Sequence, residues 1–317
     1  MASIDLKPLD QQVIVITGAS SGIGLATVEA AAKQGARLVL AARSGQALQE
    51  ICQKINDAGG KAVYVIADVG RREQVEHVAE VALQKFGRID TWINDAGGSI
   101  YGRLDEVSDE DNRRLFDTNF WGVVYGSLAA LPHLKTNGGA LINVGSEVSE
   151  AVVPLQGMYS ASKHAVKGLT DALRVEIEEI DGAPVSITLI QPTAVNTPFP
   201  QHARNYMDQE PRLPTPQIDP KDVAEAILKA AVKPERSVKV GTMAVLNTAT
   251  AKLAPGLGDK MAAKQADRQQ YDQAPVNPEG ALHQAGGTGH IYGPGPKGDQ
   301  ERILQEAAGP GGKGTAR

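Results

Sequence analysis

Short apolar runs alternate with helical patterns along residues 11–245. The first run, Val-Ile-Val-Ile at 13–16, is continuous and β-branched, which favours a strand buried on both faces of a sheet. Between the runs, apolar residues recur with helical spacing, and several of these stretches end at glycine, a common helix terminator. Strands are expected at 11–18, 37–42, 62–66, 89–93, 140–144, 185–190 and 238–240, and the main helices at 25–34, 46–57, 72–86, 109–134 and 158–180.

This alternation predicts an α/β fold with a doubly wound parallel sheet, the Rossmann fold, in a single domain over residues 1–245. The strand–helix–strand crossovers should be right-handed. In such sheets ligands bind at the carboxyl ends of the strands. The candidate chemistry falls there, at 18–24, Asp68, 94–97, Ser146 and 191–197.

The pattern changes in the C-terminal extension, residues 246–317. Thirteen glycines and six prolines lie among the 63 residues 255–317, a level typical of low complexity. The extension is therefore predicted to be accessory, either partly disordered or wrapped around the main domain. A short helix is possible at 259–273, and the expected anchors are Tyr271, Ile291, Tyr292, Ile303 and Leu304.

Composition narrows the class of protein. Hydrophobic residues make up 42% and charged residues 22% of the 317, and the net charge of -5 includes no basic stripe, which argues against nucleic acid as a partner. The lone Cys52 excludes an internal disulfide and fits a reducing compartment. No apolar run is long enough to cross a bilayer, so a cytoplasmic protein is expected. The six histidines show no metal-ligand spacing, and no metal is predicted.

Glycines 18, 22 and 24 follow the first strand and open a helix. Such a turn leaves backbone amides uncovered at a helix N-terminus, where the helix dipole favours a pyrophosphate. A lone glycine pattern is weak, but the strand–turn–helix context favours nucleotide binding over a packing turn.

The second strand ends in Ala41-Ala42-Arg43-Ser44. A carboxylate at this tip would bind the ribose 2′-hydroxyl and select NAD. Arg43 instead suits a 2′-phosphate, so NADP is expected in preference to NAD. The alternative is that Arg43 is a solvated surface cation.

Tyr159 and Lys163 lie four residues apart, on one face of a predicted helix. An ammonium near a phenol favours the phenolate and lowers the phenol's pKa from about 10. Such a pair can exchange a proton with a carbonyl or alcohol oxygen. By itself the spacing occurs often by chance, so its meaning depends on its surroundings.

Together, Thr17–Gly24 and Tyr159-x-x-x-Lys163 resemble the short-chain dehydrogenase/reductase family, over about residues 11–245. Further motifs follow in the family's order. Asp68-Val69 is similar to the pair that contacts adenine, and Asn94-Asp95-Ala96-Gly97 to the family's Asn-Asn-Ala-Gly, with Asp95 for the second asparagine. Asn119 and Ser146 match the helix asparagine and the active-site serine, and 192–197 resembles Pro-Gly-x-Val-x-Thr, with Thr193 for glycine.

The resemblance implies a catalytic tetrad of Asn119, Ser146, Tyr159 and Lys163. Ser146 would hold the substrate carbonyl, Tyr159 would supply the proton, Lys163 would lower the tyrosine pKa and bind the nicotinamide ribose, and Asn119 would hold a water. Thr197 would touch the nicotinamide carboxamide. The implied cofactor-binding residues are Gly18, Ser20, Ser21, Gly22, Ile23, Gly24, Arg43, Asp68, Val69, Asn94, Ala96, Gly97, Tyr159, Lys163, Pro192, Val195 and Thr197.

The sequence thus predicts an NADP(H)-dependent oxidoreductase that interconverts a carbonyl and a secondary alcohol. The alternatives are an NAD-linked alcohol dehydrogenase with the same tetrad, or a nucleotide-binding regulatory protein without turnover. Residues 198–218 are expected to form a lid and, with Val152, Val153, Pro154, Leu155 and Met158, an apolar pocket for a bulky substrate. Glu147 and Glu150 are expected at its rim. The resemblance also implies a homodimer or homotetramer built on the helices at 109–134 and 158–180.

Overall fold

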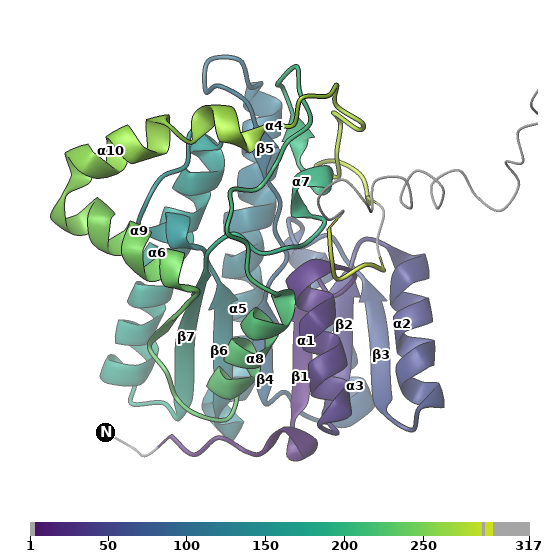
Figure 1. Ribbon diagram of the computed structural model, residues 1–317. Helices are drawn as coiled ribbons and strands as arrows, with labels where there is room; N and C mark the ends of the chain where they lie inside the picture. Colours follow the sequence, from purple (N-terminus) through teal and green to yellow (C-terminus); the bar gives the residue numbers. More distant parts are fainter. Residues whose placement is uncertain (1–3, 287–288, 294–317) are drawn as a thin grey trace, which may run out of the picture.

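A seven-stranded parallel sheet forms the centre of the fold, with strand order β3-β2-β1-β4-β6-β7-β9 (Figure 1). The computed structural model describes residues 4–286 and 289–293; the predicted anchors Ile303 and Leu304 lie outside these residues. The doubly wound fold is confirmed. The strands are β1 (Val13–Thr17), β2 (Arg37–Ala42), β3 (Lys61–Ile66), β4 (Thr91–Asn94), β6 (Gly139–Val144), β7 (Val185–Pro192) and β9 (Ser237–Val240).

Helices cover both faces of this sheet. The first face carries α1 (Gly22–Lys33), α2 (Gly45–Asp57) and α8 (Pro220–Ala230), and the second carries α3 (Arg72–Phe86), α5 (Gly122–Asn137) and α6 (Gly157–Arg174). All five residues of β1 are buried, as the continuous apolar run predicts for a strand covered on both sides.

The chain reverses its direction of winding between β1 and β4. From β1 it proceeds outward to β2 and β3, and it then returns to the other side of β1 to form β4. Thr17 and Asn94 are register partners at the carboxyl ends of these two strands. A ligand cleft is expected at this switch point.

The helix expected at 109–134 is interrupted. It consists of α4 (Asp109–Phe116), a π-helical turn (Asp117–Trp121) and α5. The helix expected to end at 180 likewise ends as α6 at Arg174, followed by a π-helical turn. A π-helical turn often marks a functional position, and the first one contains Asn119.

The segment expected to form a lid, residues 198–218, has some regular structure. It contains the short helix α7 (Phe199–His202) and strand β8 (Arg204–Asn205), which pairs in parallel with β5 (Ile100–Tyr101). This two-stranded sheet ties the segment to the loop that follows β4.

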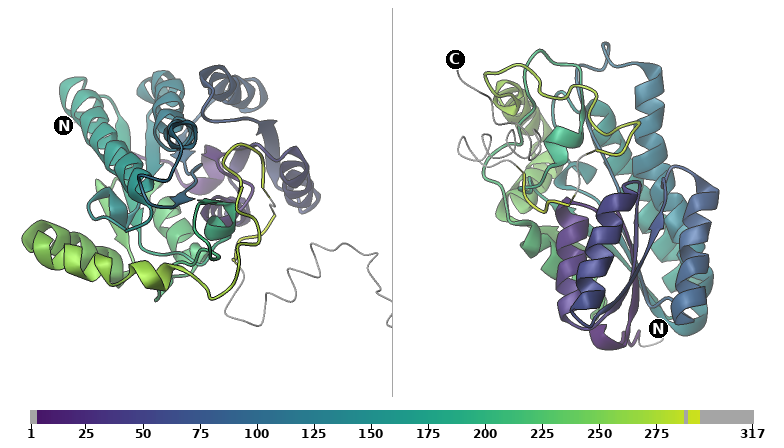
Figure 2. Two further views of the ribbon diagram at one scale, coloured as in Figure 1. Left: turned by 90° about the horizontal axis from the view of Figure 1, so that it is seen from above. Right: turned by 90° about the vertical axis from the view of Figure 1, so that its right-hand side faces the viewer.

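The extension forms α9 (Thr242–Leu253) and α10 (Pro255–Ala263), so the helix expected at 259–273 lies earlier in the chain. Within the described residues, a 3-10 turn, Ala266–Gln269, is the last helical element. Residues 270–286 and 289–293 then run back, through turns and bends, across the carboxyl ends of the strands (Figures 1 and 2). None of the helices in the described ranges has the length and apolarity needed to cross a membrane.

Candidate active site

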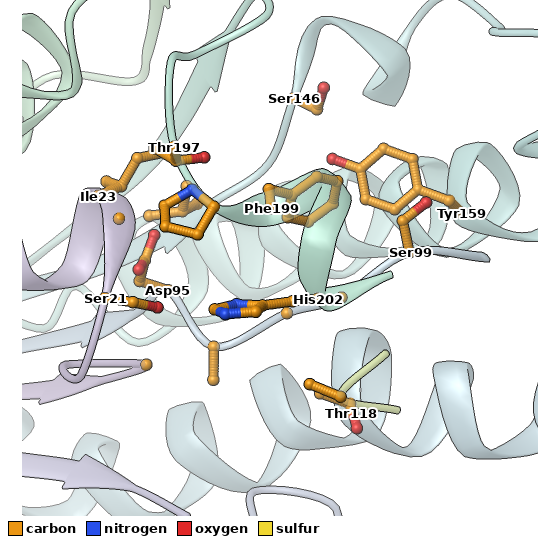
Figure 3. A pocket seen from close by; sticks show the side chains of 18 of the residues that line it. Ser21, Ile23, Asp95, Ser99, Thr118, Ser146, Tyr159, Thr197, Phe199 and His202 are labelled. Atoms are coloured by element: carbon orange, nitrogen blue, oxygen red, sulfur yellow. The ribbon is translucent and has the colours of Figure 1, made fainter. Parts of the chain in front are cut away.

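A cavity of about 250 Å³ lies at the carboxyl end of the sheet, over the switch point (Figure 3). Its wall combines the loops after β1, β2, β3, β4, β6 and β7 with α6 and a part of the extension. The structure therefore brings together most of the predicted site residues. Those lining the cavity are Gly18, Ser20, Ser21, Gly22, Ile23, Arg43, Asp68, Val69, Ala96, Gly97, Ser146, Tyr159, Lys163, Pro192, Val195 and Thr197.

The glycine turn is closely packed. Gly18 has a φ of 73°, and a Cβ there would lie 2.8 Å from the backbone of Ala96. A Cβ on Gly24 would overlap the carbonyl oxygen of Gly18. Gly24 is thus buried beneath the turn and contributes to its shape without lining the cavity.

Two of the first three backbone amides of α1 donate hydrogen bonds within the protein. The Gly22 amide donates to the carbonyl of His290 at 3.0 Å, and the Gly24 amide donates to the Asp95 carboxylate. Among the residues that the structure describes, no acceptor bonds the Ile23 amide. An uncovered amide in a cavity at a helix N-terminus fits a dinucleotide pyrophosphate.

Two arginines meet at the end of the cavity beyond β2. Arg43 donates from Nη1 to the carbonyl of Leu282 at 3.1 Å and from Nη2 to that of Ala281. Burial lowers the pKa of the Arg43 guanidinium, with a further lowering from Arg114. Arg114 itself pairs with Asp68 at 2.7 Å. Arg43 is therefore no solvated surface cation, but a partly buried group in the cleft.

Ser146 and Tyr159 face each other across the opposite end of the cavity. Both side chains are seen at this end in Figure 3, where the Tyr159 ring packs against Phe199 with centroids 5.5 Å apart. Burial raises the pKa of the Tyr159 phenol to about 12, although a hydrogen bond with Ser146 opposes this shift. The expected lowering of this pKa is wrong here, because burial raises it and the nearby acids Glu147 and Asp95 raise it further.

Lys163 is buried beside the tyrosine. Its Nζ donates to the carbonyl of Val144 at 2.9 Å and lies 5.9 Å from the centroid of the Tyr159 ring. Burial lowers the pKa of Lys163 to about 8, against an opposing effect of Asp95. Near neutral pH this ammonium can therefore give up a proton much more readily than an exposed lysine can.

Asn94 and Asn119 do not line the cavity. The Asn94 amide accepts from Trp92 Nε1 and donates to Asn143, which links neighbouring strands within the buried core. The side chain of Asn119 accepts from the Gly98 amide and donates to both the Gly98 carbonyl and Ser162. Asn119 thus fixes the loop after β4 against α6, and its water-holding role stays a prediction.

Of the two acids expected at the rim, Glu147 lines the cavity and Glu150 does not. The Glu147 residue is 7% exposed, and Oε2 accepts from Asn247 on α9 at 3.0 Å. Burial raises the pKa of Glu147. Glu150 pairs with Lys252, also on α9, at 2.5 Å. The extension therefore supports the loop that carries Ser146, a long-range contact with no local sequence signal.

Asp95, which replaces an asparagine of the family motif, leads to a prediction on stability. Burial raises the pKa of its carboxyl from 3.8 to about 7. The folded state thus binds this proton more tightly than the unfolded state, so the free energy of unfolding should fall as pH rises from about 4 to about 7. Asp95→Asn should remove this fall and stabilise the protein at pH 8 by roughly 1–2 kcal/mol, with much less effect at pH 4.5.

Urea unfolding of the two proteins at both pH values measures this difference. An Asp57→Asn variant on the surface of α2 is the control; because it keeps Asp95, its stability should fall with pH as that of wild type does. Equal stability of wild type and Asp95→Asn at pH 8 would contradict the burial argument.

A doubly wound sheet, a glycine turn at its switch point and a serine, tyrosine and lysine in the same cleft define a dinucleotide-dependent oxidoreductase. The sequence profile of the family described as short chain dehydrogenase matches residues 12–208. The chain belongs to this family.

Its relatives include the uncharacterized oxidoreductase YxnA of Bacillus subtilis (strain 168), 44% identical over 295 residues that span 92% of this chain and 83% of the relative. This coverage necessarily includes part of the extension. 11-beta-hydroxysteroid dehydrogenase A of Sesamum indicum is 36% identical over 72% of this chain and 67% of its own length.

Two solved structures are also similar. An alcohol dehydrogenase from the archaeon Thermococcus sibiricus, complexed with 5-hydroxy-NADP, has a TM-score of 0.63 at 30% identity, covering 72% of this chain and 94% of that one. A short chain dehydrogenase/reductase from Burkholderia phymatum, in complex with NAD, has a TM-score of 0.68 at 28% identity, covering 86% and 100%. Binding of NAD or NADP is therefore a property of the family, and these two structures do not favour one dinucleotide over the other.

Proposed function

We propose that the protein is an NADP(H)-dependent oxidoreductase that interconverts a carbonyl compound and a secondary alcohol, with Tyr159 as the general acid and base. The observation that carries this proposal is the convergence of the Ser146 and Tyr159 hydroxyls beside buried Lys163, in the cavity that also contains the uncovered Ile23 amide. A regulatory protein without turnover would have no need for this arrangement.

The protonation states favour carbonyl reduction at neutral pH. With a pKa of about 12, Tyr159 retains its proton, so it can donate to a carbonyl oxygen held by Ser146. The phenolate left behind lies beside Lys163, whose pKa of about 8 makes it a suitable source of the replacement proton. When bound, the nicotinamide supplies or accepts the hydride.

The residues present fit a dinucleotide. The Ile23 amide would bind its pyrophosphate, and Thr197, buried beside the glycine turn, would contact the nicotinamide end. At the other end, Arg43 lines the cavity where an adenosine ribose is expected, and Arg114 shares the Leu282 carbonyl with it. The proposed preference for NADP rests on Arg43, because the tip of β2 carries no acid.

Arg43→Ala is expected to weaken NADPH binding roughly 10–100-fold, because a charge-assisted hydrogen bond to the 2′-phosphate is lost. NADH binding should change only a few-fold, which fluorescence titration of both cofactors can measure. Arg72→Ala, which removes an exposed guanidinium paired with Glu76, is the matched control. Equal losses for NADPH and NADH, or tighter binding of NADH by wild type, would favour the NAD-linked alternative.

The proposed substrate is a bulky, largely apolar ketone or secondary alcohol. Near Tyr159 the cavity wall includes Val148, Val153, Phe199, Leu213 and Pro214. Oxidation of NADPH with a graded series of ketones and aldehydes tests the activity directly. Turnover should increase with the apolar bulk of the ketone, and a complete lack of turnover with bound NADPH would favour the regulatory alternative.

The proposed assembly is a homodimer or homotetramer built on α5 and α6. Apolar side chains along these helices and their π-helical turns face solvent in the single chain. Their exposures are 44% for Trp121, 47% for Leu128, 51% for Val175 and 74% for Ile180. Light scattering of the purified protein measures the state.

A further inference from the structure

The strap, defined here as residues 277–286 and 289–293, forms one wall of the candidate cofactor cleft. Ala281, Leu282, Ala285 and Gly286 line the same cavity as Arg43 and Asp68. Ala281 and Leu282 are almost completely buried, at 9% and 5% exposure. These residues therefore pack against the main domain at the cleft, in the part of the chain that was expected to be accessory.

The strap bonds to residues of the cofactor site itself. Arg43 donates to the carbonyls of Ala281 and Leu282, and Arg114 donates to that of Leu282 at 3.1 Å. Farther along, the Gly289 amide donates to the Ser20 carbonyl at 2.8 Å, and the His290 carbonyl accepts from Gly22. Of these partners, Ser20, Gly22 and Arg43 belong to the segments expected to hold the adenosine and pyrophosphate, and Arg114 lies on α4.

Other contacts tie the strap to the lid segment. His283 Nε2 bonds to Asp111 at 2.7 Å, and Asp111 also accepts from Tyr206 and Arg204 of the lid segment. The Ala281 amide donates to the carbonyl of His202 at 2.8 Å. The strap therefore connects the predicted lid segment, residues 198–218, to the loops expected to hold the cofactor.

We propose that the strap is a cofactor-retaining element that closes over the adenosine end of the dinucleotide and must open for its exchange. The inference rests on the proposed use of NADP(H). The strap could either enclose the dinucleotide or compete with it for the same site. Enclosure is favoured, because the cavity lies between the strap and the strand ends and the strap leaves the Ile23 amide uncovered. The carbonyls of Ala281 and Leu282 also fix the guanidinium of Arg43, which lines the cleft.

Two full-length variants weaken the strap at different points. His283→Ala removes the bond to Asp111, and its matched control is His77→Ala, which removes a bond to Glu80 on the surface of α3. Gly280→Ala pushes the strap from Ala203, since its Cβ would overlap the Ala203 carbonyl. Its control is Gly59→Ala, because Gly59 also has a positive φ, 86°, but no neighbouring atom within 4 Å.

Stopped-flow displacement of bound NADPH, followed by its fluorescence, measures the dissociation rate. Both strap variants should release NADPH roughly tenfold faster than wild type, as expected for loss of an interaction that acts on dissociation. Release rates equal to those of the matched controls would overturn the proposal. Tighter NADPH binding in the strap variants would also overturn it, because the strap would then be a competitor.

Hydrogen exchange of the wild-type protein provides a readout independent of catalysis and of any substitution. With saturating NADPH, the amides of residues 279–286 should exchange more slowly, because the closed strap is stabilised. Unchanged or faster exchange with bound NADPH overturns the proposal. Failure of wild type to bind either dinucleotide would instead refute the proposed function, so the two failures are distinguishable.

Discussion

Tyr159→Phe is expected to lower the rate of NADPH-dependent ketone reduction by ~10²–10⁴-fold, the range typical of a lost general acid. The substitution keeps the ring and its packing against Phe199 and removes only the hydroxyl that faces Ser146. Since the phenol has a pKa of about 12, removing it does not remove a charge from the folded protein at neutral pH. Stability and NADPH affinity should therefore remain close to those of wild type.

Steady-state rates and fluorescence titration of NADPH test this prediction together. Tyr64→Phe, at a tyrosine 38% exposed on β3, is the matched control and should leave both unchanged. Reduction within a few-fold of the wild-type rate would dismiss Tyr159 as the acid. Loss of NADPH binding together with activity would mean that the hydroxyl acts in binding instead.

The fold could be predicted because its causes are local. Val13–Thr17 is buried along its whole length, so its apolar character is continuous and recognisable in the sequence. Gly18 requires a positive φ and Gly24 a close backbone approach, and only glycine satisfies both demands. Most of the predicted site residues follow strands of one parallel sheet, so they meet at its carboxyl edge and line one cavity.

The features of the site that the sequence does not predict depend on contacts between residues that are distant in sequence. Nothing near Arg43 indicates that carbonyls of residues 281 and 282 bind it, and nothing near Glu147 indicates a partner on α9. The raised pKa of Tyr159 results from burial by the assembled cleft, which the Tyr-x-x-x-Lys spacing does not encode. Asn94 lies outside the cavity lining and bonds to Asn143 on the next strand, so its contact with a cofactor stays a prediction.

The glycine turn provides a second large expected effect, at Gly24. In Gly24→Ala the new Cβ would overlap the Gly18 carbonyl oxygen and lie 2.8 Å from Asp95 Oδ2. The first of these atoms is backbone, so the turn must widen, and the start of α1 must move relative to β1. Overpacking of this kind destabilises proteins by about 1–3 kcal/mol. We expect NADPH binding to weaken at least ~100-fold, because the Ile23 amide and Arg43 no longer reach one dinucleotide together.

Fluorescence titration and thermal unfolding of Gly24→Ala separate the effect on binding from that on stability. Gly168→Ala on α6 is the matched control, since its Cβ would have no neighbouring atom within 4 Å, and a helical alanine is favoured over glycine. The control should bind NADPH normally and unfold at an equal or higher temperature. If Gly24→Ala bound NADPH as tightly as this control does, a widened turn would not affect binding. The geometry that we assign to the pyrophosphate site would then be wrong, because that geometry requires the start of α1 to stay in place.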